Sequence, residues 1–303
     1  MRLLVLLALV IVGALGGGIL MAGLALMSGQ SVSDMLKGSD SNMSDWMVRI
    51  TLLLNHLTMF IIPAILWAFI YYNKKWMKAL DLVPGSKWSF IGMGILLLIV
   101  AYPIVAISAE MNASLHLPDW MHDMEGQTEV IMKKILHMDS IGSLLMNVLI
   151  IGIIPGIGEE LIFRGIIQKS LYKYVANPYV AILLASILFS ALHFQFEGFL
   201  PRVILGMILG LIYFWSGSLW PNIAAHAFNN GIQVVMTYFN PKMIDSSPED
   251  MHVEWYVLLG SLALSFLVGI WFYNKKKEQD TPTPSIATIE MDGFKTNETD
   301  HDE

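Results

Sequence analysis

The sequence predicts an all-α fold: a polytopic membrane helix bundle with about eight transmembrane helices. Of its 303 residues, 55% are hydrophobic and only 14% are charged, and the mean hydropathy is +0.59. Soluble domains carry about 25% charged residues. Eight apolar runs approach the length of about 20 residues that crosses a bilayer as a helix. Composition and run length together indicate an integral membrane protein.

The first apolar run, residues 3–27, is longer than the apolar core of a signal peptide, which has about 7–15 residues. It is therefore interpreted as a retained span. Tryptophan and tyrosine side chains gather near the ends of the later runs, as interfacial aromatic residues do. In chain order, the later runs are residues 50–72, 88–107, 141–163, 179–196, 200–215, 219–238 and 255–273.

Four regions follow from this order. Residues 1–140 hold three spans and an extracytoplasmic loop. Within that loop, Glu129 and Lys133 lie four residues apart and apolar residues recur on one face, which predicts a short surface helix. Residues 141–240 hold the next four runs together with the polar motifs described below, and residues 241–277 contain the last span. Residues 278–303 are rich in Pro, Thr and acidic residues, which predicts a disordered acidic tail.

The positions of the basic residues predict the orientation. Arg2 precedes the first run, lysines follow the second run, and Lys275, Lys276 and Lys277 follow the last. Because cytoplasmic loops are enriched in Lys and Arg, both termini are expected in the cytoplasm, and a bacterial cytoplasmic membrane is expected as the location. The net charge of −7 offers no basic stripe, so nucleic-acid binding is excluded. The absence of cysteine excludes disulfides and thiolate nucleophiles.

Two adjacent acids, Glu159 and Glu160, follow the long apolar run that begins at residue 141. Carboxylates are costly in hydrocarbon and by default mark a functional site. At a rise of about 1.5 Å per helical residue, the two helical arms around residue 177 have nearly equal lengths. After His193 the chain turns again and returns to a similar depth at His226. His193 and His226 are therefore expected at the depth of Glu159.

Spacing within these motifs indicates how the side chains would act. Residues four apart share a helix face, and three pairs have this spacing: Glu160 with Arg164, Phe189 with His193, and His226 with Asn230. Hydrolysis needs a base that takes a proton from water and donors for the developing oxyanion. Glu159 and His193 suit the first task, and His226 and Asn230 suit the second. Arg164 would neutralise Glu160.

Simpler interpretations stand beside these. The glutamate pair could be interfacial acids at a helix end, and His226 with Asn230 could form a polar clamp between helices. Asn229 could replace Asn230, although it lies about 100° from Asn230 around the helix. The polar residues Asn55 and His56 in the second run are interpreted as packing or hydrogen-bonding residues.

A metal is an open alternative. Two histidines and a carboxylate, namely Glu159, His193 and His226, could hold one divalent ion such as zinc with an open position. The sequence has no His-Glu-x-x-His motif, however, and an amide partner at Asn230 favours an oxyanion site. The chemistry could therefore depend on the glutamate alone or on a metal.

The combined pattern Glu159-Glu160-x-x-x-Arg164, Phe189-x-x-x-His193 and His226-x-x-x-Asn230 resembles the CPBP intramembrane proteases. These are bacterial relatives of the CAAX prenyl protease and are also called the Abi family. The resemblance covers about residues 140–240. It implies peptide-bond hydrolysis at or within the membrane without a covalent acyl intermediate. In the family, the residues matching Glu159 and His193 are taken to activate water, and those matching His226 and Asn230 to form the oxyanion site.

The sequence therefore predicts an intramembrane endopeptidase that acts on a membrane-associated protein or peptide. Two alternatives from other classes are a non-catalytic membrane immunity or scaffold protein and a proton-linked transporter. A transporter would need a continuous polar path, which the first three runs do not offer. The expected partners are the lipid bilayer and a membrane protein or peptide substrate. The natural substrate and the oligomeric state are not readable from the sequence.

Overall fold

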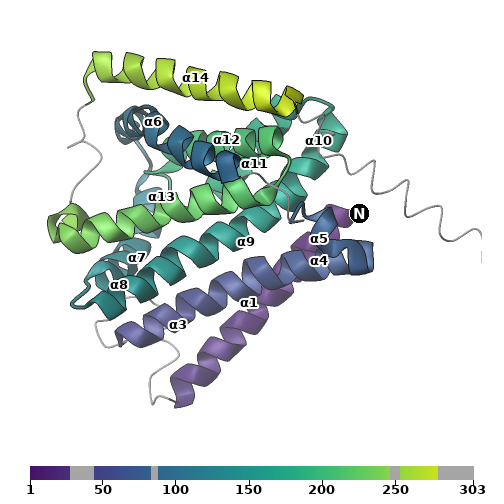
Figure 1. Ribbon diagram of the computed structural model, residues 1–303. Coiled ribbons are helices and arrows are strands. Elements are labelled where there is room, and N and C mark those ends of the chain that lie inside the picture. Colours follow the sequence, from purple (N-terminus) through teal and green to yellow (C-terminus); the bar gives the residue numbers. More distant parts are fainter. Residues whose placement is uncertain (28–43, 83–87, 246–252, 279–303) are drawn as a thin grey trace, which may run out of the picture.

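The computed structural model describes residues 1–27, 44–82, 88–245 and 253–278, and within these ranges it contains helices and no strand (Figure 1). The predicted all-α membrane bundle is confirmed. The helices are α1 (Arg2–Met27), α3 (Asp45–His56), α4 (Ile62–Tyr72), α5 (Trp76–Ala79), α6 (Trp88–Ala113), α7 (Asp119–Leu136), α8 (Ile141–Asn147), α9 (Ile154–Ile162), α10 (Lys169–Val175), α11 (Pro178–Ala191), α12 (Phe199–Ser216), α13 (Leu219–Phe239) and α14 (Trp255–Glu278).

Several of these helices are joined end to end by wider or tighter turns. The π-helical segment η1 (Leu57–Ile61) joins α3 to α4, and the 3₁₀ turn η2 (Asn73–Lys75) joins α4 to α5. The π-helical segments η3 (Val148–Ile153) and η4 (Phe163–Gln168) join α8, α9 and α10 into one long helix. A 3₁₀ turn, η5 (Pro241–Asp245), follows α13.

The predicted count of eight spans is not confirmed. Among the described residues, six helices are long and apolar enough to cross a membrane: Arg2–Met27, Asp45–Ala79, Trp88–Ala113, Ile141–Val175, Phe199–Ser216 and Trp255–Glu278. The runs at 179–196 and 219–238 fall outside this set for different reasons. Helix α11 has only 14 residues, because the chain leaves the helix after Ala191. Helix α13 is long enough, but Asn222, His226 and Asn230 make it polar.

The loop and tail predictions have different outcomes. The loop predicted to contain a short surface helix does contain a helix, α7, which runs from Asp119 to Leu136 and has 18 residues; its position at the membrane surface stays a prediction. Residues 279–303, where an acidic disordered tail is predicted, lie outside the described part of the chain.

Helix α9 lies at the centre of the bundle. It contacts α13 on one side and the α3–η1–α4 helix on the other, an order that Figure 1 shows clearly. Helix α1 packs behind η1 and α4, whereas α6, α12 and α14 pack together beyond α13. Two clusters of buried apolar side chains fill these two halves. Helix α9 is thus surrounded by protein, which suits a segment that carries two carboxylates.

Small residues allow α9 and α13 to approach closely. A Cβ atom built on Gly156 would lie 2.9 Å from the backbone nitrogen of Ala227, and one on Gly152 would lie 3.1 Å from the backbone of Gly231. Helices in membranes associate by close packing of small residues of this kind. Because Glu160 lies one turn after Gly156, this approach places the acid pair against the polar face of α13.

We expect Gly156→Ala to lower the free energy of unfolding by about 1–3 kcal/mol, the usual cost of overpacking a tight contact. The added methyl group would press on backbone, which has no rotamer that relieves the clash. Gly92→Ala in α6 is the matched control, because a Cβ atom added there would meet no other described part of the protein within 4 Å. Chemical denaturation in detergent micelles measures both variants. Equal stability of the two variants would contradict the prediction.

Candidate active site

The acid pair lies on a short α-helical stretch with a π-helical segment on each side. Helix α9 contains Glu159 and Glu160, with η3 before it and η4 after it. Such wide turns are rare and occur frequently at functional sites. Both glutamates are buried, with 6% and 0% of their surface exposed. Successive helical residues point about 100° apart, so the two carboxylates enter different surroundings.

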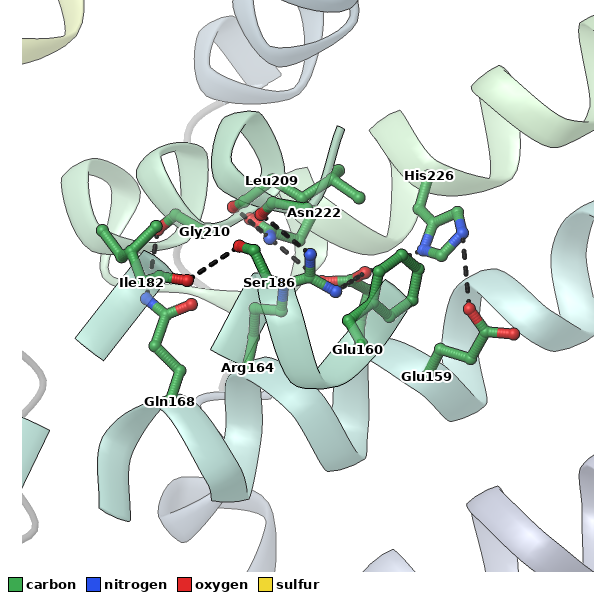
Figure 2. A network of polar contacts seen from close by, with 12 residues as sticks. Glu159, Glu160, Arg164, Gln168, Ile182, Ser186, Leu209, Gly210, Asn222 and His226 are labelled. Atoms are coloured by element: carbon green, nitrogen blue, oxygen red, sulfur yellow. Dashed lines mark hydrogen bonds and ion pairs between the residues drawn. The ribbon is translucent and has the colours of Figure 1, made fainter. Parts of the chain in front are cut away.

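Glu160 is fully occupied by partners. Its Oε1 accepts a hydrogen bond from Nη1 of Arg164 at 2.7 Å and contacts Nδ1 of His226 at 2.7 Å. Its Oε2 accepts from Nδ2 of Asn222 at 3.1 Å (Figure 2). The predicted pairing of Glu160 with Arg164 is therefore present. Because both oxygens are used and none of the side chain is exposed, Glu160 is suited to holding other residues in place.

Arg164 anchors this network to two further elements. Its Nη2 donates to the backbone oxygen of Gly206 on α12 at 3.0 Å. Its guanidinium carbon lies 5.0 Å from the centre of the Phe189 ring on α11. One cation thus connects α9, α11 and α12, and its charge balances that of Glu160 in the interior.

Glu160 also fixes the ring of His226. Since the carboxylate accepts the proton on Nδ1, the neutral ring carries its lone pair on Nε2, which lies 3.7 Å from Oε2 of Glu159. Figure 2 shows this ring between the two carboxylates. His226 is therefore held so that Nε2 is directed at Glu159.

Glu159 lies between two imidazoles. Its Oε2 is 3.7 Å from His226, and its Oε1 is 3.5 Å from Nε2 of His56 on α3. Within the described ranges, the ion pairs of Glu159 are with these two histidines only. Its ion-pair partners in this part of the chain are therefore imidazoles, whereas Glu160 is paired with an arginine.

His193 lies just beyond the end of α11. Its Nδ1 donates to the backbone oxygen of Phe189 at 2.7 Å, one of the carbonyls that a helix end leaves unpaired. The ring of Phe189 lies 4.8 Å from the His193 ring and 6.0 Å from the His226 ring, between centroids. Phe189 therefore contacts both histidines, and its supporting role stays a prediction.

The loop after His193 is held by a buried amide from another helix. Asn112 on α6 donates to the backbone oxygens of Phe196 and Glu197 at 2.9 and 2.8 Å, and its oxygen accepts from the backbone of Leu200 at 2.9 Å. No direct hydrogen bond or ion pair joins the side chains of His193 and Glu159 in the described structure.

Asn230 lies one turn after His226 on α13, as predicted from its spacing. Its Nδ2 donates to the backbone oxygen of Ile151 at 3.4 Å, and its Oδ1 accepts from Nδ2 of Asn229 at 3.1 Å. Asn229 therefore contacts Asn230 directly. The described contacts of Asn230 do not include Glu159 or His226, so its place in an oxyanion site stays a prediction.

The metal alternative does not fit the arrangement of these side chains. Among the described residues, no group of three or more His, Cys, Asp or Glu is placed to hold a metal ion. The proposed ligand set of Glu159, His193 and His226 is thus not brought together as a coordination site.

Two residues in the network were not assigned to the site from the sequence. Asn222 precedes His226 by four residues, and this spacing could have indicated a third polar position on the same face of α13. His56 was interpreted as a packing residue. Its only signal was a titratable group within an apolar span, and no sequence pattern connects it to Glu159.

A segment that contains most of these site residues matches a known protein family. Residues 141–232 match the family described as "Type II CAAX prenyl endopeptidase Rce1-like". The uncharacterized protein YpbD of Bacillus subtilis is 28% identical over 171 residues, which cover 55% of this chain and 80% of YpbD. The membrane-embedded CAAX protease MroQ of Staphylococcus aureus is 28% identical over 115 residues, 36% of this chain and 46% of MroQ. No solved structure gives a significant match.

Proposed function

We propose, from the premise that residues 141–232 make this chain a member of the Rce1-like family, that it hydrolyses peptide bonds of a membrane-associated protein or peptide with water activated by Glu159. The observation that carries the proposal is the carboxylate of Glu159 between two imidazole nitrogens, at 3.5 and 3.7 Å. This carboxylate is buried, and both of its ion-pair partners are imidazoles. A purely structural acid would have a fixed cation, as Glu160 has in Arg164.

The proposed reaction begins with a water molecule between Glu159 and His193. Glu159 takes one proton, and the water oxygen bonds to the carbonyl carbon of the scissile peptide. His226, donating from Nε2 in its doubly protonated form, stabilises the negative charge on the carbonyl oxygen, and Asn230 is the proposed second donor. The C–N bond then breaks, and the leaving nitrogen receives the proton from Glu159 by way of His193. The immediate products are a carboxylic acid and an amine, and transfer of the remaining water proton from the acid to the amine gives a carboxylate and an ammonium group.

Glu160 acts through His226 in this scheme. It keeps the Nδ1 proton in place and leaves Nε2 facing the reaction. Arg164 compensates its charge, and Asn222 fixes its second oxygen. Preorganised donors of this kind are effective because they do not need to reorient during the reaction.

The proposed location is a bacterial cytoplasmic membrane with both termini on the cytoplasmic side. The N-terminus, α5, α10 and the C-terminal end of α14 lie at the same end of the bundle in Figure 1. Basic residues occur at this end, among them Lys74 and Lys275. Their common position supports the proposed orientation, because Lys and Arg are retained in the cytoplasm.

The test is cleavage of a membrane-peptide library by the purified protein in liposomes, with mass spectrometry of the new termini. We expect products with the wild type and none with Glu159→Gln, which also controls for contaminating proteases. A full set of products from the variant, or none from the wild type with any peptide, would argue against the proposal. In that case the non-catalytic role would be tested by a phenotype that survives Glu159→Gln.

We expect cleavage to be insensitive to the chelator 1,10-phenanthroline, because the described site residues do not form a metal-binding group. A zinc protease assayed in the same liposomes is the control that the chelator works there. Loss of activity on chelation, followed by recovery on addition of zinc, would contradict this expectation.

A further inference from the structure

We propose that His56 is a positioning residue that holds the carboxylate of Glu159 for water activation. His56 lies on α3, outside the family segment of residues 141–232. The inference rests on the proposed function, since it assigns a task within the same site. It also makes the N-terminal spans part of the active site.

The ring of His56 is held at three places. Its Nδ1 lies 3.1 Å from the backbone oxygen of Leu52, and its Nε2 lies 3.5 Å from Oε1 of Glu159. The ring stacks on Phe60, with 5.5 Å between centroids and 22° between planes. Both nitrogens therefore face oxygen atoms. The doubly protonated ring donates to both, whereas the neutral ring donates to one, so the charged form of His56 is the better partner for ionised Glu159.

The backbone that follows His56 packs closely against α9 and α1. The π-helical segment η1 begins at the next residue, and a Cβ atom on Gly158 would lie 2.9 Å from Cβ of Phe60. Helix α9 and η1 therefore touch directly beside Glu159. Behind η1, Thr58 lies against Gly13 and Gly17 of α1. The N-terminal helices thus support His56 from the side of α9 that lies opposite α13.

The two histidines act on different oxygens of Glu159. His226 faces Oε2 and His56 faces Oε1, so together they restrict rotation of the carboxylate. Without His56, the described contacts would hold only one of the two oxygens. Misplacement of a catalytic group by about 1 Å can lower the rate on the order of a hundredfold. His56 is also partly accessible, with 22% of its side chain exposed, so a packing role alone does not account for its place.

The experiment compares His56→Phe and His56→Gln in the full-length protein in liposomes. Phenylalanine keeps an aromatic ring to stack on Phe60 but removes both nitrogens, whereas glutamine keeps a hydrogen-bond donor. We expect His56→Phe to lower kcat by about tenfold to a hundredfold with KM and thermal stability unchanged, and His56→Gln to recover part of the loss. Asn55→Ala, one residue away and about 100° around the helix, is the matched control and should retain wild-type kcat.

A second measurement does not need turnover. The carboxylate stretching bands of Glu159, identified by subtracting the infrared spectrum of Glu159→Gln, should shift in His56→Phe and not in Asn55→Ala. Unchanged bands, wild-type kcat in His56→Phe, or equal losses in the Phe and Gln variants would overturn the assignment. Activity of Glu159→Gln would instead reject the proposed function, while a band shift in His56→Phe would still establish the contact.

Discussion

Glu159→Gln is expected to abolish detectable peptide cleavage while the protein stays folded and inserted. Glutamine has nearly the same shape as glutamate but cannot accept a proton from water at neutral pH. General base catalysis contributes about 10²–10⁴-fold to a rate, so kcat should fall by at least the lower figure. Stability should change little, because glutamine keeps the size and shape of glutamate and the contacts of Glu159 with the two histidines, at 3.5 and 3.7 Å, are long.

The measurement is the initial rate of cleavage of one library-derived peptide in liposomes, with circular dichroism to verify folding. Glu110→Gln is the matched control. It makes the same chemical change at an exposed position on α6 and should retain full activity. Wild-type rates in Glu159→Gln would show that another group activates the water.

Arg164→Met is expected to cause the largest loss of stability of any substitution considered. Arg164 is 1% exposed and bonds to Glu160 and to the backbone of Gly206. Removing one partner of a buried ion pair leaves an uncompensated charge and costs about 3–5 kcal/mol. The double variant Arg164→Met with Glu160→Gln removes both charges and should recover part of this loss.

Chemical denaturation in detergent micelles compares the two single variants with the double variant. A coupling free energy between the substitutions is the quantity that tests the pair. Lys74→Met is the control, because Lys74 is exposed at η2. If Arg164→Met unfolded at the same denaturant concentration as this control, the buried pair would not stabilise the fold.

Part of the site could be predicted from the local spacing of residues in the sequence. The pairing of Glu160 with Arg164 follows from residues four apart on one helix face, and the structure contains it at 2.7 Å. The turn near residue 177 was also predictable, because Asn177 caps α11 and Pro178 begins it. Both features depend on neighbours within one or two turns of the chain, which a single sequence records directly.

Contacts between distant helices were not predictable in this way. His56 contacts Glu159 because Gly158 allows η1 to approach α9 closely. On the other side of α9, Gly156 allows α13 to approach. These are packing relations between segments about a hundred residues apart. The predicted count of eight spans is not confirmed, because α11 ends at Ala191 and α13 carries several polar residues.

The neighbouring residues Glu159 and Glu160 have the same side chain but different bonding partners. Glu160 is bonded to an arginine and to two side chains of α13, whereas Glu159 has only imidazoles as partners among the described ion pairs. A single step along the backbone thus separates an acid bonded into the scaffold from the acid that is proposed to activate water. To exchange these environments, α9 would have to rotate by about 100° about its axis. The close contacts of its glycines with neighbouring helices prevent such a rotation.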